Sequence, residues 1–250
     1  IDIILNNATG TSVTMAKGTV FTTTVKDTSY QYITNSDFTT TPVAGVYKFS
    51  SVPIYEGSLV TFKYTYDSTD ADQKFIIPSN KADTSTLSVK VQNSSQDTTT
   101  ETFALAGGYN NVTATSKVYF IQEGQDGKYE IYFGDGVNGK ALQDGNIIIM
   151  EYIVTNIAES NGASSFKLNG NIGGFTNVTI STTSSSQGGV LGETNDSIKL
   201  NAPLQYAAQE RAVTTTDYES LVKTIYPNAL SVSAWGGEDD ETPRYGIVKI

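Results

Sequence analysis

Cysteine and histidine are both absent from this chain of 250 residues. Without cysteine there is no disulfide framework, no thiolate metal site and no cysteine nucleophile. Without histidine the chain also lacks the commonest general base and any imidazole ligand. Only chemistry based on carboxylates, on a Ser/Lys pair or on tyrosine is left. We therefore expect a protein that is not an enzyme and that carries no cofactor or metal.

Basic residues are scarce as well. The 16 Lys and Arg residues face 26 Asp and Glu, which gives a net charge of −10 and a pI near 4.4. This balance disfavours binding to nucleic-acid phosphates or to an anionic membrane surface. No apolar run approaches the roughly 20 residues that cross a bilayer. We expect neither nucleic acid nor a membrane among the partners.

The two ends of the sequence resemble cut ends. Residue 1 is not Met, and there is no basic segment or cleavage site of a signal peptide behind it. The last residues, 245–250, have the composition of a strand that stops in the middle. We expect a fragment of a longer protein.

β-Structure is the dominant prediction. Thr makes up about one residue in seven, and Val, Ile, Tyr and Phe are abundant, all of which suit a pleated, half-buried surface. Period-two patterns predict strands over residues 19–25, 58–66 and 86–92. The second pattern places Val60, Phe62, Tyr64 and Tyr66 on one face. Residues 27–46 are rich in Ser, Thr, Asn and Asp and are predicted to form hairpin loops with short edge strands.

The strongest local signal is a hairpin. Apolar runs at 118–122 and 129–133 flank Asp126-Gly127, a dipeptide favoured where both turn residues need positive φ. Residues 147–154 are apolar on both faces and predict a central strand. Short strands are expected near 166–168 and 178–181, and residues 182–189 are expected to form a mobile loop.

Helices are expected only near the end. Apolar spacing predicts one or two helices over about 195–210, kinked or divided by Pro203. A further helix begins with Thr214 as its cap and Asp217 in its first turn, and Pro227 ends it. Its apolar face is formed by Tyr218, Leu221, Val222 and Ile225. Residues 230–235 then predict a strand, followed by an acidic loop and a partner strand from Tyr245.

The predicted fold class is therefore mainly β with a small α+β part, in which antiparallel β-sheet domains precede a C-terminal helix-helix-strand segment. Three parts are predicted: a β domain over residues 1–100, a second β domain with the FGDG hairpin over 101–190, and a truncated α+β segment over 191–250.

Five residues are candidates for binding, as interface or inter-helix contacts. Arg211 would either read a partner carboxylate or pair internally, with Asp217 or a helix carbonyl, and fix the angle between the helices; we favour the internal role. Trp235 is the only Trp and would serve equally well as an interface anchor or a core plug. Tyr206 and Tyr218 lie on the apolar faces of the two predicted helices.

Acidic clusters are weaker candidates. Residues 238–241 (EDDE) lack the alternate spacing of a Ca²⁺ loop, and we interpret them as a solvated loop or a charged guard on a sheet edge. Residues 135–139 match only half of a Ca²⁺ loop and are better explained as two tight turns. No carboxylate pair stands out for glycoside hydrolysis.

Three stretches follow one another in a characteristic order. They are residues 132–140 (YFGDGVNGK) ahead of the strand at 147–152; Gly188-Gly189 with Glu193-Thr194 and Ala202-Pro203; and residues 211–214 (RAVT) with residues 217–219 (DYE). Taken together, they resemble the baseplate J-like family of contractile-tail proteins. The resemblance runs from about Gly18 to the end and is nearest to the wedge proteins that form the inner ring in T-even-like phages.

The resemblance implies a structural protein of a phage tail baseplate wedge, located in the virion and assembled in the host cytoplasm. Its expected partners are itself, as a homodimer and a ring of copies around the tail hub, and other baseplate wedge proteins. We place the homodimer contact in the helical C-terminal part. The alternative is a carbohydrate-binding tail adhesin module, suggested by the acidic β composition rich in Tyr and Asn. The helices that carry residues 211–219 favour the structural role.

Overall fold

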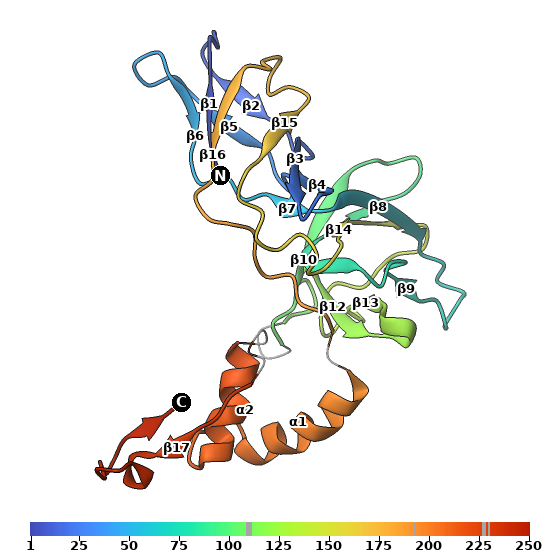
Figure 1. Ribbon diagram of the computed structural model, residues 1–250. Coiled ribbons are helices and arrows are strands. Elements are labelled where there is room, and N and C mark those ends of the chain that lie inside the picture. Colours follow the sequence, from blue (N-terminus) through green and yellow to red (C-terminus); the bar gives the residue numbers. More distant parts are fainter. Residues whose placement is uncertain (109–111, 193, 227–228, 230) are drawn as a thin grey trace. The chain divides into compact units, whose positions relative to one another are not determined.

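The computed structural model of the chain describes residues 1–108, 112–192, 194–226, 229 and 231–250. It divides into two compact units, residues 1–187 (unit 1) and residues 188–250 (unit 2). Strands make up 37% and helices 13%, in mostly antiparallel sheets followed by two helices and a strand (Figure 1). The predicted fold class is confirmed.

Unit 1 begins and ends in a β lobe, lobe A, which comprises residues 1–57 and 156–187. One sheet has the order β16 (Val178–Ser181), β1 (Asp2–Leu5), β6 (Tyr47–Phe49). A second has the order β15 (Lys167–Asn169), β3 (Val20–Val25), β4 (Thr28–Ile33), β7 (Tyr55–Glu56), and β2 (Val13–Met15) pairs with β5 (Phe38–Thr40). Alternate residues of these strands, among them Ile3, Met15 and Phe21, share one apolar core.

Residues 27–46 hold more regular structure than the predicted loops and short edge strands. Strand β4 is six residues long and lies inside its sheet, between β3 and β7. The turn before it consists of Lys26 and Asp27, whose φ angles of 47° and 63° are those of a tight hairpin turn. The prediction was wrong for β4 because Lys26-Asp27 lacks the Gly that most often marks a two-residue hairpin turn.

Residues 58–155 form a second lobe, lobe B, on one seven-stranded sheet. Its order is β8 (Ser58–Thr65), β14 (Ile147–Val154), β10 (Ala82–Gln92), β11 (Thr100–Leu105), β12 (Val118–Glu123), β13 (Tyr129–Phe133), β9 (Phe75–Ile76). Among the described residues, β11 and β12 pair in parallel, and the other neighbouring strands of this sheet pair antiparallel. Strand β14 is internal, as predicted from its apolar run, and Ile148, Met150 and Tyr152 are buried in the core of lobe B.

The chain enters lobe B after β7 and returns to lobe A after β14. The core of lobe A accordingly combines residues from both ends of unit 1, whereas the core of lobe B draws on the middle alone. Lobe B is thus an insertion into lobe A. The predicted domain boundaries near residues 100 and 190 stay a prediction.

Two predicted features of lobe B are confirmed. The β12–β13 hairpin turns through η1 (Gln125–Gly127), in which Asp126 and Gly127 have φ angles of 60° and 66°. On β8, the predicted stripe faces the core of lobe B, where Tyr64 and Tyr66 pack edge-on or tilted against the ring of Phe75. Phe62 belongs to the same stripe but remains partly exposed at the sheet edge.

Residues 182–189, the segment predicted to be mobile, are hydrogen-bonded to lobe A through Ser186. The Ser186 hydroxyl donates to the Ser160 carbonyl (2.6 Å) and accepts from the Ala163 amide (2.8 Å). Its backbone amide also donates to the Ala163 carbonyl at 2.8 Å. Ser186 therefore holds the last turn of lobe A shortly before unit 2 begins.

Unit 2 contains α1 (Asn195–Ala208), α2 (Thr215–Ile225), β17 (Trp235–Gly236), η2 (Gly237–Asp239) and β18 (Val248–Lys249). Helix α1 is a single helix that continues through Pro203, which agrees with the one-helix alternative and not with a division there; proline removes only the bond to the carbonyl four residues back. The strand predicted over residues 230–235 is far shorter than expected, because residues 231–234 are not in a strand. Leu230 and Pro227 lie outside the described residues.

No helix among the described residues is long and apolar enough to cross a membrane.

Candidate interaction surface

Unit 2 exposes most of its large apolar side chains. We call this set the C-terminal surface. It comprises Ile198, Leu200, Leu204 and Tyr206 of α1, Val213, Ile225 and Tyr226 around α2, and Trp235, Tyr245, Ile247, Val248 and Ile250 of the terminal hairpin. Tyr206 is 81% exposed and Tyr245 is 83% exposed. Exposed apolar side chains in this number are available for contact with another protein.

Local hydrogen bonds fix helix α2. The Thr214 hydroxyl accepts from the Asp217 amide at 3.2 Å, and the Asp217 carboxylate accepts from the Thr214 amide at 2.8 Å. Thr214 is the cap that the sequence predicted, and the bond that Asp217 returns makes this a reciprocal capping box, which satisfies backbone donors that a helix start leaves unpaired. The amides of Thr214 and Val213, in that order, hold the pKa of Asp217 below its usual value.

Arg211 lies just before this cap and is exposed. Its guanidinium donates to the Gln209 side chain at 3.0 Å, and its charge lowers the pKa of Asp217 less than any other cause. The geometry therefore gives Arg211 a local hydrogen bond to Gln209 in place of a direct ion pair with Asp217. Whether it also reads a partner carboxylate stays a prediction.

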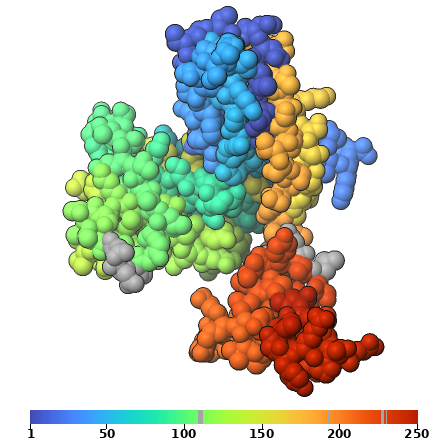
Figure 2. All heavy atoms as spheres, turned by 90° about the vertical axis from the view of Figure 1, so that its left-hand side faces the viewer, coloured from blue at the N-terminus to red at the C-terminus, as the bar shows by residue number. Residues whose placement is uncertain are grey.

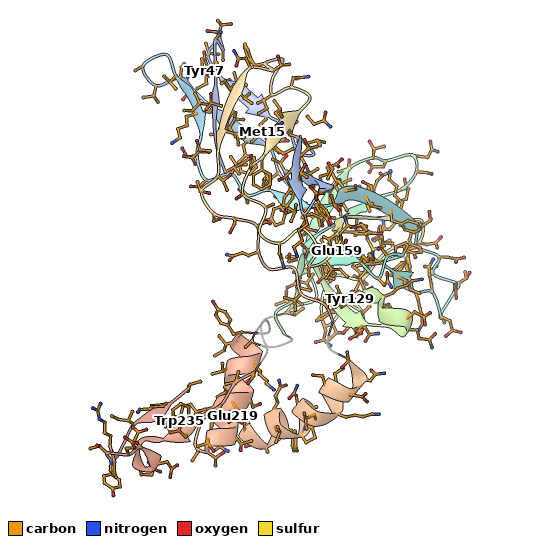
Figure 3. All side chains as sticks on the ribbon, in the orientation of Figure 1. Met15, Tyr47, Tyr129, Glu159, Glu219 and Trp235 are labelled. Atoms are coloured by element: carbon orange, nitrogen blue, oxygen red, sulfur yellow. The ribbon has the colours of Figure 1, made fainter. Side chains whose placement is uncertain are left out.

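Trp235 is 39% exposed, and its orientation is fixed from the hairpin side. The indole N–H donates to the Asp240 carboxylate at 3.2 Å, and Asp240 also forms an ion pair with Lys249. Lys249 first, and then Trp235, lowers the pKa of Asp240. The amide of the preceding residue, Ala234, donates to the Glu219 carboxylate of α2 at 2.9 Å. Figure 3 labels Glu219 and Trp235.

The two tyrosine candidates differ in their surroundings. Tyr206 projects from α1 into solvent, whereas Tyr218 of α2 is half-buried. The recorded bond between the helices comes instead from Gln205, whose side-chain amide donates to the Thr224 hydroxyl at 3.0 Å. Both tyrosines stay candidates for interface contacts. Ile225, expected on the buried face of α2, is exposed.

Glu219, Asp240 and Lys249 orient Trp235, and sequence reasoning missed their roles. The sequence shows the acidic run containing Asp240 only as a whole, and no local pattern singles out one carboxylate within it. The Asp240–Lys249 pair forms because β17 and β18 pair antiparallel, a contact that no local pattern encodes. The lone Trp followed by Gly236-Gly237 was the only available signal.

The FGDG loop has a structural explanation. The Asp135 carboxylate accepts from the amides of Asn138 (2.8 Å) and Val137 (2.9 Å), and these bonds, in that order, lower its pKa. Lys140, at the end of the motif, pairs with Glu101 of β11, which also takes Lys117 at 3.1 Å. These contacts bind the loop to the sheet. Among the described residues, no three acidic side chains converge as ligands for a metal ion.

Comparison with known proteins extends over most of the chain. Residues 58–162, which include lobe B, match the model of the family described as bacteriophage baseplate wedge protein gp6, third domain. Residues 214–250, which include α2 and the terminal hairpin, match that of baseplate structural protein gp6, C-terminal domain I. The baseplate wedge protein gp6 of Enterobacteria phage T4 is 25% identical over 261 residues, which cover 94% of this chain and 38% of that protein. The chain thus spans about two fifths of the length of this relative.

Proposed function

We propose that this chain is a member of the gp6 family of phage baseplate wedge proteins and serves as a structural part of the wedge in a phage tail baseplate. In this proposal it is a tail component of the virion. Its role in this proposal is to join copies of itself and neighbouring wedge proteins, and to catalyse no reaction. The lack of Cys and His supports the last point.

The observation that carries the proposal is the C-terminal surface. Burying one exposed Leu, Ile or aromatic side chain contributes about 1.5–3 kcal/mol. Several such side chains, including Leu200, Tyr206, Ile225 and Tyr245, stand in water in an isolated copy. Covering them with a second copy supplies a favourable free energy that unit 2 does not obtain internally. We accordingly place the homodimer contact in unit 2.

Charge sets a condition on this contact. Two copies that each carry −10 repel at long range, but physiological salt screens charges beyond about 8 Å. Association must then depend on short-range contacts between apolar or hydrogen-bonded groups. Trp235, with its orientation fixed by Asp240 and Lys249, has the properties of an anchor in such a contact. A ring of copies requires a further contact with other wedge proteins or with a third copy.

The adhesin alternative needs a platform of exposed tyrosines on the β lobes. Tyr30, Tyr32, Tyr47, Tyr119 and Tyr152 are instead buried in the two cores of unit 1. The abundance of tyrosine is therefore largely explained by packing, and we retain the structural role.

Sedimentation equilibrium of the full chain tests the proposal. We expect a monomer–dimer equilibrium, and the double substitution Tyr206→Ser and Ile225→Ser should raise the dimer dissociation constant about tenfold or more. The control is Val43→Ser with Val137→Ser, two valines of unit 1 that are at least 70% exposed. A wild-type chain that stays monomeric at high micromolar concentration would contradict the homodimer, and turnover of a substrate by the purified chain would contradict the structural role.

A further inference from the structure

One face of lobe B carries lysines in an otherwise acidic protein. In the sheet, Lys63 of β8 is opposite Ile149 of β14, and Ile149 is opposite Lys90 of β10. Residues directly opposite each other point to the same face of a sheet. Both lysines are exposed, and Ile149 between them is half-buried. We call these three residues the basic row.

The basic row has no acidic partner among the described residues. The recorded ion pairs include neither Lys63 nor Lys90. The nearest acid in the sheet is Glu151, in the adjacent row of the same face, and Lys17 of lobe A already pairs with it. Burial first, and then the charge of Lys90, lowers the pKa of Lys17. The field of Lys90 thus reaches Lys17, and this face carries a positive surplus.

A complementary group of charges lies in unit 2. The turn between β17 and β18, at the deep red end of the chain in Figures 1 and 2, carries Glu238, Asp239, Asp240 and Glu241. Asp240 is occupied by Trp235 and Lys249, which fixes the shape of the turn. The other three carboxylates are exposed and enter no recorded ion pair. We call residues 238–241 the acidic tip.

We propose that the acidic tip of one copy docks on the basic row of a second copy. The inference rests on the proposed self-association and adds to it a second contact, between unit 2 of one copy and unit 1 of the other. In a twofold dimer the same contact is made twice, because each copy offers both the tip and the row. Opposite charges at this contact offset the repulsion between two copies of −10 and fix their orientation, since like-charge juxtaposition elsewhere is unfavourable. Ile149 supplies apolar area between the two lysines.

Charge reversal on each side provides the test, measured as the dimer dissociation constant by sedimentation equilibrium. Lys63→Glu with Lys90→Glu should raise the constant about tenfold, and Glu238→Lys with Glu241→Lys should do the same. The four changes combined should restore it to near the wild-type value, because the two sets of charges are exchanged.

The matched control is Lys81→Glu with Lys167→Glu, two exposed lysines outside the basic row that change the net charge by the same amount. Equal effects of this control and of the row reversal would overturn the proposal, as would failure of the combined variant to regain the dimer. Circular dichroism of each variant checks that the fold is retained.

The outcomes separate the two proposals. A wild-type dimer that tolerates all reversals contradicts only the docking contact, whereas a wild-type monomer contradicts the homodimer itself. A third outcome also overturns the proposal. At concentrations below the dimer dissociation constant, the charge reversals could lower the stability of the monomer, and the combined variant could restore that stability. This result would show that the tip docks on the row within one copy.

Discussion

Unit 1 encloses two apolar cores built from Ile, Val, Met, Phe and Tyr, whereas the fully buried apolar side chains in the described part of unit 2 are the alanines Ala208 and Ala234. Unit 2 nevertheless contains Leu, Ile, Tyr and Trp in number. The two regions thus differ less in composition than in what their apolar side chains contact. Unit 1 buries its apolar side chains in cores of its own, whereas the described part of unit 2 leaves most of its large apolar side chains exposed.

The geometry of the elements explains the difference. In a strand of unit 1, alternation puts every second side chain on the same face, so Ile148, Met150 and Tyr152 enter one core together. In α1, Ile198 and Leu200 are two residues apart and therefore point to opposite sides of the helix. A helix that is apolar on several sides cannot bury them all against α2 alone. The apolar area of α1 that stays exposed is part of the C-terminal surface.

The largest expected effect is a loss of stability in unit 1 that has no counterpart in unit 2. Met150→Ala in the core of lobe B should lower the free energy of unfolding of unit 1 by about 2–5 kcal/mol, because it removes buried contacts and leaves a cavity. Leu200→Ala on the exposed side of α1 should change stability by less than about 0.5 kcal/mol at concentrations below the dimer constant. Comparable losses would mean that unit 2 has a core of its own.

Urea unfolding can follow both units in one sample. The only Trp of the chain, Trp235, lies in unit 2, so its fluorescence reports on that unit. Far-UV circular dichroism is dominated by the strands of unit 1. Met150→Ala should shift the transition followed by circular dichroism and leave the transition followed by Trp235 fluorescence in place.

The sequence predicted those elements that local chemistry determines. The apolar run at 147–154 gave the internal strand, Asp126-Gly127 gave the hairpin, and Thr214 with Asp217 gave the capping box. In each case, neighbouring residues alone decide the conformation. The predicted apolar face of α2 failed at Ile225, because exposure depends on which other elements are available to cover a helix.

Features that depend on distant pairing were not predictable. The insertion of lobe B into lobe A depends on β16 returning to β1, across more than 170 residues of sequence. The parallel contact of β11 with β12 and the unmarked turn at Lys26-Asp27 have no local signature either. For the candidate site, the sequence named Trp235 but not Glu219 or Lys249, since the terminal hairpin brings them together only after folding.

A smaller effect sharpens the comparison within unit 2. If local bonds and not a core order α2, then Thr214→Ala should weaken that helix by about 1 kcal/mol, because it removes the acceptor for the Asp217 amide. Hydrogen exchange of the α2 amides should become faster, while β14 should keep its protection. Thr216→Ala, an exposed position in the same turn with no recorded side-chain bond, is the control. Unchanged exchange in α2 would show that packing, not the cap, orders the helix.

The smallest effect concerns acid, and it compares an ion-pair cluster of unit 1 with one of unit 2. Lys140 first, and then Lys117, lowers the pKa of Glu101, and Lys249 lowers that of Asp240. Because each folded pKa lies below its unfolded value, each carboxylate stabilises the fold above the unfolded pKa, near 4.5 for Glu and 3.8 for Asp, and this stabilisation is lost as the pH falls through the folded pKa. Glu101→Gln should therefore flatten the acid side of the circular dichroism transition, and Asp240→Asn that of the Trp235 fluorescence transition. If either substitution flattened both transitions equally, the two units would unfold as one cooperative body, and the contrast between a self-sufficient and a partner-dependent region would fail.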